Sequence, residues 1–420
     1  MSDIEHEWKT NPRWRGITRP YKAETVEGLK PSIDIEYSFS KKGAGRFWKQ
    51  LQEQPFIRAM GALTGGQAVE MARGGLEAIY LSGWQVAGDA NESGHTYPDQ
   101  SFYPCDSVPK LVKRINNAFM RADLVEKTDG NGGDTDWYLP IIADGEAGFG
   151  GSLHTFELTK HMIEAGAAAI HLEDQLATEK KCGHLGGKVL IPATQFIHKL
   201  VAARLAADVV NVPLIIMART DAGSARLISQ DCDEIDRPFL TGERSPEGYF
   251  KTRGGLEAAI VRAKAYAPYV ELIWFETSTP DFEEARVFAE EVRKDFPHIK
   301  FGYNCSPSFN WAAHLSDDEV AKFQETLAEW GYAFQFITSG GWHIVRYNSF
   351  KMARKYRETG MSAFVGLQKS EFSAVSEGYT AVKQQRENGT GYFDAVLECV
   401  TGGTASTMAL GESTEAEQFS

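Results

Sequence analysis

The side chain of this sequence best suited to chemistry is Cys182, in residues 180–188 (KKCGHLGGK). Cationic neighbours such as Lys180 and Lys181 lower the pKa of a thiol and make it a usable acid, base or nucleophile. The sequence therefore predicts a lowered thiol pKa at Cys182, tuned also by His184. Three glycines in nine residues predict a mobile loop that closes over a substrate. A surface turn with an incidental cysteine is the alternative.

A second set of candidates consists of acidic residues in separate segments, Asp99, Asp144, Glu146 and Glu173. Carboxylate oxygens are hard ligands that suit Mg²⁺, with Mn²⁺ also possible, and these ions keep several waters. Ordinary solvated carboxylates are the alternative, because acidic residues on loops usually face water. A zinc site at Cys182 and His184 is disfavoured, because no second Cys/His pair stands at finger spacing.

Eight short apolar segments predict strands that would position these side chains. Most precede a helical pattern, as at 155–165 and 194–209, which predicts a parallel sheet covered by helices. Eight such units predict a closed (β/α)₈ TIM-type barrel. An open doubly wound sheet is disfavoured, because only a ring gathers the polar residues that end at least six of these strands. The predicted strands are 56–63, 78–83, 139–144, 168–173, 213–219, 272–276, 301–304 and 334–338.

Two helical extensions are expected to flank a barrel over residues 56–345. Residues 1–55 form the N-terminal extension. Residues 346–420 form a C-terminal helical segment and tail, which we expect to serve assembly and active-site closure. Residues 221–255 are expected to be a long polar excursion after the fifth strand.

The composition excludes several classes of partner. A net charge of -13 over 420 residues, with no long basic run, argues against nucleic acid and anionic membranes. No apolar run is long enough to span a bilayer, and the N-terminus has no secretory pattern. Five scattered cysteines without a C-x-x-C pair favour a reducing compartment. We therefore expect a cytoplasmic protein.

Several long motifs resemble the isocitrate lyase family. They are 14–21 (WRGITRPY), 80–91 (YLSGWQVAGDAN), 143–150 (ADGEAGFG), 169–175 (AIHLEDQ), 180–188 and 303–311 (YNCSPSFNW). The resemblance covers nearly the whole chain. The chain is similar to the short bacterial form, without the central insertion of plant and fungal members, within the isocitrate lyase/phosphoenolpyruvate mutase superfamily.

The resemblance implies a Mg²⁺-dependent retro-aldol cleavage of isocitrate, a small tricarboxylate, to glyoxylate and succinate in the glyoxylate cycle. Cys182 would be the acid that protonates succinate on carbon. Tyr80 and Glu276 are both candidates for the base, and His171 is expected to be a supporting hydrogen-bonding group. The family also implies a homotetramer that exchanges helices after the barrel. In the metal site, Asp144 would ligate directly, and Asp99, Glu146 and Glu173 largely through water.

The resemblance also implies which residues bind the substrate. Arg219 can hold a carboxylate through two parallel hydrogen bonds, although an internal ion pair with Asp221 is the alternative. Gly183 and His184 of the loop belong to the same site. The glyoxylate part would lie against Ser82, Gly83 and Trp84, and the succinate part against Asn304, Ser306, Ser308 and Thr338.

Two positions depart from the family pattern. Ser339 stands where most members have leucine after Thr338, and Ser420 stands where a histidine is usual. Ser339 alters the expected pocket wall, so 2-methylisocitrate lyase, which yields pyruvate and succinate, is the alternative within the superfamily. From another class, the alternative is a non-catalytic scaffold that uses Cys182 as a redox-sensing thiol.

Overall fold

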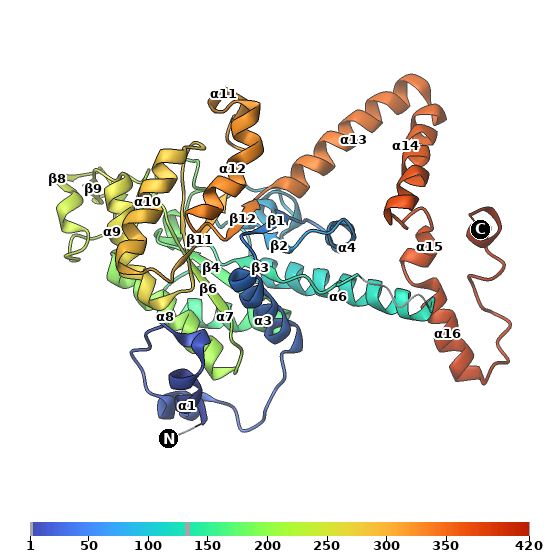
Figure 1. Cartoon of the computed structure of the whole chain (residues 1–420), viewed down its shortest axis with the longest axis horizontal. Helices are drawn as coiled ribbons and strands as arrows, with labels where there is room; N and C mark the ends of the chain where they lie inside the picture. Colours follow the sequence, from blue (N-terminus) through green and yellow to red (C-terminus); the bar gives the residue numbers. More distant parts are fainter. Residues whose placement is uncertain (1–2, 131–134, 420) are drawn as a thin grey trace.

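The computed structural model of the chain describes residues 3–130 and 135–419 and is built on a closed barrel of parallel strands (Figure 1). Each of the eight predicted segments overlaps one barrel strand, so the (β/α)₈ prediction is confirmed and the open sheet is wrong. Ser420 lies outside the described residues. In barrel order the strands are β1 (Ile57–Gly61), β2 (Ala78–Leu81), β3 (Ile141–Asp144), β4 (Ala169–Glu173), β6 (Ile215–Thr220), β10 (Leu272–Phe275), β11 (Lys300–Asn304) and β12 (Phe334–Ile337).

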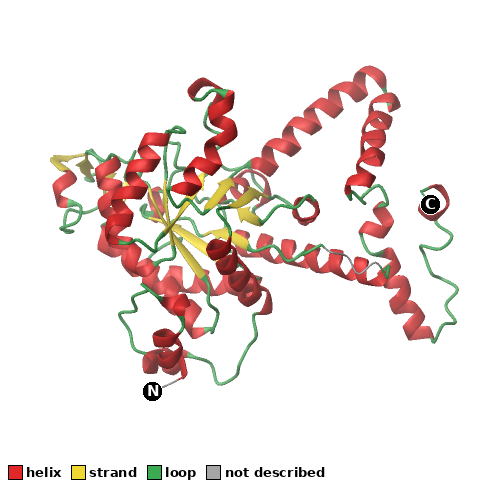
Figure 2. Cartoon of the chain, in the orientation of Figure 1, coloured by secondary structure: helices red, strands yellow, loops and turns green. Residues whose placement is uncertain are grey.

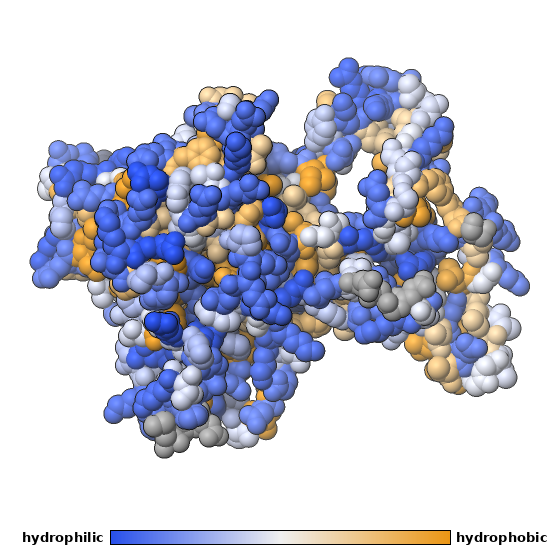
Figure 3. Space-filling view, viewed as in Figure 1, coloured by the Kyte–Doolittle hydropathy of each residue, from blue (hydrophilic) through white to orange (hydrophobic). Residues whose placement is uncertain are grey.

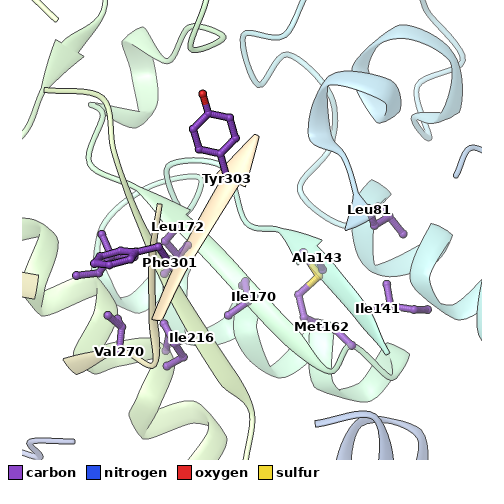
Figure 4. Packing of buried hydrophobic residues seen from close by; sticks show 14 of the residues in the cluster. Leu81, Ile141, Ala143, Met162, Ile170, Leu172, Ile216, Val270, Phe301 and Tyr303 are labelled. Atoms are coloured by element: carbon purple, nitrogen blue, oxygen red, sulfur yellow. The ribbon is translucent and has the colours of Figure 1, made fainter. Parts of the chain in front are cut away.

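The strands are apolar throughout because both of their faces are buried. In β4, Ala169 belongs to the cluster inside the barrel, whereas Ile170 and Leu172 pack outward beneath the helices (Figure 4). The barrel interior is filled by aromatic rings, with Tyr80 stacked on Phe336 at 4.4 Å between ring centroids. A packed interior leaves the carboxyl ends of the strands as the place for a site.

Helices form the outer layer around the barrel (Figure 2). The long helices α7 and α8 pack on each other, and α8 buries several alanines among its apolar residues. The main barrel helices are α4 (Gly65–Arg73), α6 (Ser107–Thr128), α7 (Ser152–Ala165), α8 (Ala193–Val209), α9 (Leu256–Tyr266), α10 (Phe282–Asp295) and α12 (Asp317–Glu329). Short helices α5 (Gly83–Gln85) and α11 (Trp311–His314) follow β2 and β11.

The N-terminal segment contains α1 (Asp3–Thr10), α2 (Ala23–Leu29) and α3 (Ser38–Glu53). Helix α3 buries Phe47 and Leu51 against the amino ends of the strands, and the Phe47 ring lies 5.2 Å from that of Phe334. This helix therefore closes the end of the barrel opposite the polar strand ends.

Residues 221–255 are more ordered than the sequence indicated. They supply β7 (Leu227–Ile228), β8 (Leu240–Arg244) and β9 (Phe250–Thr252), which join β5 (Val189–Leu190) in a small second sheet. Strands of two to five residues are too short for a period-two pattern to stand out among polar neighbours. Because β5 directly follows residue 188, this sheet anchors the far end of the Cys182 loop.

The C-terminal helices extend away from the barrel (Figure 1). Many apolar side chains on them face outward, among them Tyr347 and Phe350 of α13 and Phe364 of α14 (Figure 3). None of the described helices has both the length and the apolar character needed to cross a bilayer. These helices are α13 (Gly340–Thr359), α14 (Met361–Ala374), α15 (Gln384–Glu387), α16 (Thr390–Thr401) and α17 (Thr414–Gln418).

A buried ion cluster stabilises the amino end of the barrel. The Glu271 carboxylate accepts hydrogen bonds from Arg204 at 2.6 and 2.7 Å, from Arg13 at 2.8 Å and from the Ile216 backbone at 2.8 Å. Burial alone would raise the pKa of Glu271, but the two arginines hold it below its usual value. Glu271 therefore carries its charge in the folded protein at neutral pH.

We expect Glu271→Gln to lower the free energy of unfolding by about 3–5 kcal/mol at pH 7, because two buried guanidinium groups lose their counterion. The pKa of this carboxyl is lower in the folded state, so its contribution is present above its unfolded-state pKa and is lost as pH falls through the folded value. Urea unfolding from pH 7 to pH 3 measures both effects. Glu291→Gln, which removes an exposed pair with Lys294, should change stability by less than about 0.5 kcal/mol. Equal losses in the two variants would contradict this role for Glu271.

Candidate active site

A cavity of about 240 Å³ opens at the carboxyl ends of the barrel strands. Among the catalytic and substrate-binding candidates from the sequence, all except Gly83 line it, as do Asp99 and Asp144. The barrel thus brings together residues that lie up to 258 positions apart, from Tyr80 to Thr338. The lining comprises Tyr80, Ser82, Trp84, Asp99, Asp144, Cys182, Gly183, His184, Arg219, Trp274, Glu276, Asn304, Ser306, Pro307, Ser308, Thr338, Ser339, Trp342 and His343.

The four predicted metal ligands gather on one side of this cavity, and all are buried. The Lys180 ammonium lies among them: it contacts Asp99 and Glu146 and lies 3.8 Å from Glu173. The sequence identified Lys180 only as a neighbour that tunes the thiol. Its side chain instead compensates the charge of the carboxylates, which a position within a loop could not reveal.

Several hydrogen-bonding groups hold Asp144 in place. The backbone N–H of Gly83 donates to Oδ2 at 2.8 Å, the N–H of Glu146 donates to Oδ1 at 2.8 Å, and His171 Nε2 lies 3.2 Å from Oδ1. Burial would raise the pKa of Asp144, but His171 and Lys180 hold it below its usual value. Gly83 therefore contributes its backbone N–H to Asp144 and does not line the cavity. A Cβ at this position would lie 2.5 Å from Glu146 Oε1, so a larger residue would clash.

Glu146 and Glu173 of the cluster have raised pKa values. Burial raises the pKa of Glu146 to about 7, against the opposing charge of Lys180, and burial also raises that of Glu173. Tyr103, which the sequence analysis missed, donates a hydrogen bond to Glu146. No local motif distinguishes Tyr103 from an ordinary core tyrosine. The cluster thus contains more negative charge than its protein cations balance.

This donor set fits a hydrated divalent cation. Glu173 Oε1 accepts no hydrogen bond from the described residues, although it is buried. Within residues 3–130 and 135–419, no three Asp, Glu, His or Cys side chains are assembled as a direct ligand set. Mg²⁺ typically takes one or two protein carboxylates and keeps waters at its other positions, so one direct ligand with water-linked neighbours suits it.

Tyr80 and His171 form a hydrogen-bonded pair beside Asp144. Tyr80 Oη lies 2.7 Å from His171 Nε2 and 3.4 Å from Asp144 Oδ2. Burial raises the pKa of Tyr80 well above its usual value, and the Asp144 charge adds to this shift. Tyr80 is therefore protonated at neutral pH, and His171 takes the supporting position expected of it.

The expectation of a lowered thiol pKa at Cys182 is wrong. Burial raises the pKa of this thiol to about 12, with the Asp99 charge adding to the shift and Lys180 opposing it. Lys180 directs its ammonium to the carboxylates, and Lys181 pairs with Glu179 at 3.5 Å. The thiol is thus a protonated group held in the cavity wall, suited to give a proton.

The Cys182 loop lies packed over the cavity. The Cys182 N–H donates to the Asp99 carbonyl at 2.9 Å. A Cβ on Gly183 would lie 2.4 Å from Glu276 Oε1 and 2.6 Å from an Arg219 nitrogen. A glycine is needed here because the loop backbone approaches these two side chains so closely.

Glu276 and Arg219 both line the cavity, and both lie close to the backbone of Gly183. Glu276 Oε1 lies 3.2 Å from His184 Nε2 and accepts from Asn304 Nδ2 at 3.3 Å, while Oε2 has no hydrogen bond among the described residues. Arg219 donates to both Asp221 oxygens at 3.1 Å and lies 3.2 Å from Glu173. Arg219 therefore forms the internal ion pair with Asp221 that was the alternative, and it also lines the cavity.

Neutral groups make up much of the rest of the cavity lining. Ser306 Oγ accepts from the Ser308 N–H at 3.0 Å, so the turn itself orders this pair. Trp84 lies edge-on to Trp342, 5.1 Å between centroids. The sequence did not identify Trp274, Trp342 and His343 as lining residues. An aromatic residue in a strand or an amphipathic helix is usually part of the hydrophobic core, so its type and position alone do not indicate a site.

Comparison with known proteins identifies relatives over the full chain. Residues 1–247 and 242–419 match the model of the isocitrate lyase family. The chain is 57% identical over 420 residues to an isocitrate lyase of Corynebacterium efficiens, covering 99% of this chain and 97% of that one. It is 56% identical to isocitrate lyase 1 of Mycobacterium tuberculosis, with coverage of 99% and 97%, and 53% identical to the Escherichia coli isocitrate lyase, with coverage of 100% and 98%.

Solved structures of more distant proteins share the fold. A 2,3-dimethylmalate lyase, 19% identical, superposes with a TM-score of 0.57 over 89% of this chain and 98% of its own. An oxaloacetate acetylhydrolase, 18% identical, gives a TM-score of 0.57 over 87% and 99%. At this identity the likeness concerns the barrel architecture alone.

Proposed function

The chain belongs to the isocitrate lyase family, and from this premise we propose that it cleaves isocitrate to glyoxylate and succinate. It is then a carbon–carbon lyase of the glyoxylate cycle. The observation that carries the proposal is the full-length identity of 53–57% to named isocitrate lyases. The site adds a physical reason, because a protonated thiol and a cluster of hard ligands line one cavity.

We assign the two halves of the substrate to different residues of the cavity lining. Arg219 supplies a guanidinium for a carboxylate, and His184 and Gly183 approach it from the loop. We assign the glyoxylate half to Ser82, Gly83 and Trp84. We assign the succinate half to the neutral donors Asn304, Ser306, Ser308 and Thr338, which line the cavity together.

The residues of the carboxylate cluster would hold Mg²⁺, or Mn²⁺. Asp144, ionised at neutral pH, is the direct ligand, and Asp99, Glu146 and Glu173 act mainly through water. The bound metal supplies Lewis-acid polarisation of the oxygen at the bond that breaks. The buried, unpartnered Glu173 Oε1 supports this assignment.

Proton transfer is assigned to residues of the cavity wall. A base takes the hydroxyl proton, and Glu276 suits this step better than Tyr80, because Glu276 Oε2 is free of hydrogen bonds from the described residues. Tyr80 is already protonated and could act only by passing its proton to His171. The Cys182 thiol then delivers a proton to the succinate carbon.

A second substrate is favoured by one residue. Ser339 lines the cavity beside Thr338, and its side chain is smaller than the leucine usual at this position. One methylene is worth only about 1–3 kcal/mol of discrimination, so 2-methylisocitrate is a candidate secondary substrate giving pyruvate and succinate. The redox-scaffold alternative is disfavoured, because sensor thiols need a low pKa and exposure.

We expect purified protein to release glyoxylate from isocitrate, trapped as its hydrazone, and excess EDTA to abolish this. Asp144→Asn should lower activity by about 100-fold or more, because even residues behind a metal ligand cost 10- to 100-fold. Glu291→Gln on the surface is the control and should retain full activity. Undiminished turnover in EDTA would reject the metal role. If pyruvate is released from 2-methylisocitrate faster than glyoxylate from isocitrate, 2-methylisocitrate is the preferred substrate.

Replacing the thiol tests the acid role. We expect Cys182→Ser to lower kcat by about 100- to 10,000-fold with little change in KM, because a hydroxyl is the weaker acid. In D₂O, mass spectrometry of the succinate from the wild-type protein should reveal one non-exchangeable deuterium. Near-normal turnover by Cys182→Ser would remove this role.

We propose a homotetramer in the cytoplasm, assembled through the C-terminal helices. Their exposed apolar residues, among them Tyr347, Phe350 and Phe364, form a surface that monomers rarely leave in water. Light scattering should therefore give four times the chain mass of 46.5 kDa. Phe350→Asp combined with Phe364→Asp should lower that mass. A stable monomer of the wild-type chain at micromolar concentration would contradict the assembly.

A further inference from the structure

Behind the Cys182 loop lies a group of buried polar side chains that the mechanism does not use. Gln175, Lys188 and Asp221 are 0, 2 and 0% exposed, and none of them lines the cavity. Gln175 precedes the loop, Lys188 ends it, and Asp221 follows β6. Buried polar groups of this kind are costly unless each has a structural partner.

Gln175 binds the start of the loop through its side-chain amide. Its Oε1 accepts from the backbone N–H of Lys181 at 3.0 Å, and its Nε2 donates to the Lys181 carbonyl at 2.9 Å. The same Nε2 lies 3.1 Å from Asp221 Oδ2. One amide thus fixes both backbone groups of the residue next to Cys182.

Lys188 binds the middle of the loop from the other side. Its ammonium donates to the carbonyl of Gly183 and to the hydroxyl of Ser224, and it lies 3.3 Å from Asp221 Oδ1. These three partners hold the buried Lys188 ammonium in a fixed position. The backbone on both sides of Cys182 is therefore held by side chains that contact Asp221.

Asp221 also connects the loop to Arg219. Both of its oxygens accept from this guanidinium at 3.1 Å, while Arg219 faces the cavity. The bridge between Gln175 and Leu190 and the pairing of β5 with β7 fix the two ends of the loop. Asp221 is thus the common point of the loop contacts and the substrate-facing arginine.

We propose that Gln175, Lys188 and Asp221 are positioning residues that form a latch, holding residues 180–188 closed over the cavity and tying closure to Arg219. The latch deepens the proposed function, since it sets how often Cys182 is in place to give its proton. Removing it leaves every substrate-contacting residue present but shifts the loop toward open forms. Opening exposes the thiol to water and to reagents, which gives a readout independent of turnover.

The test uses the full-length chain and two variants. Lys188→Met removes the ammonium at similar length, and the isosteric Gln175→Glu removes the amide donors and sets a carboxylate against Asp221. Lys294→Met and Gln230→Glu make the same changes at exposed positions on the surface. If Lys188→Met fails to fold, the isosteric Gln175→Glu decides.

The first readout is alkylation of Cys182 by iodoacetamide without ligand, followed by peptide mass spectrometry with the exposed Cys105 as internal reference. We expect at least about tenfold faster alkylation of Cys182 in both latch variants and no change in the controls. The second is turnover of isocitrate with Mg²⁺, where kcat should fall about tenfold or more with a smaller change in KM.

Folded latch variants in which alkylation of Cys182 stays within twofold of wild type would overturn the latch, whatever their kcat. A protein that is merely destabilised would show a lowered Tm with wild-type alkylation below it, which also overturns the proposal. If the wild-type chain fails to cleave isocitrate, the proposed function is lost. The alkylation ratios still decide the latch in that case.

Discussion

Four carboxylates buried at one end of the barrel are the constraint on which the rest of the site depends. Uncompensated charges in such a place cost several kcal/mol each, so cations must be brought to them. Lys180 meets this need, and it comes from the loop that also contains Cys182. Charge compensation therefore draws the thiol over the cavity. The proposed metal site and the proposed proton donor would then both follow from one electrostatic requirement.

The compensation continues as an alternating series of charges away from the cluster. Glu173 pairs with Arg219, Arg219 with Asp221, and Asp221 with Lys188, which returns to the loop at Gly183. Each member is buried and is stabilised by neighbours of opposite sign. Such a series has few intermediate arrangements, because moving one member leaves another uncompensated. We therefore expect the loop of residues 180–188 to be either fully closed or open, and rarely partly closed.

The sequence predicted the barrel and the residues at its strand ends well, because both follow from periodicity along the chain. All eight strands overlap their predicted segments, and polar residues such as Asn304 lie at the carboxyl ends as expected. It failed where burial decides the outcome: the thiol pKa of Cys182, the position of Lys180 and the role of Tyr103 depend on groups distant in the chain. The short strands within residues 221–255 were not predicted, because each is too short to show the alternation of apolar and polar residues that identifies a strand.

The surroundings of Cys182 bear on its proposed role as proton donor. Burial in the closed loop is the main cause of the raised pKa of the Cys182 thiol, which is therefore protonated at neutral pH. In an open loop the same thiol would lie in water, where an ordinary cysteine has a pKa near about 8.5. The thiol is therefore largely protonated at neutral pH in both forms, and closure acts by placing the proposed acid over the cavity. A residue that stabilises the closed loop acts on the chemistry through the proton of Cys182, even when it touches no substrate.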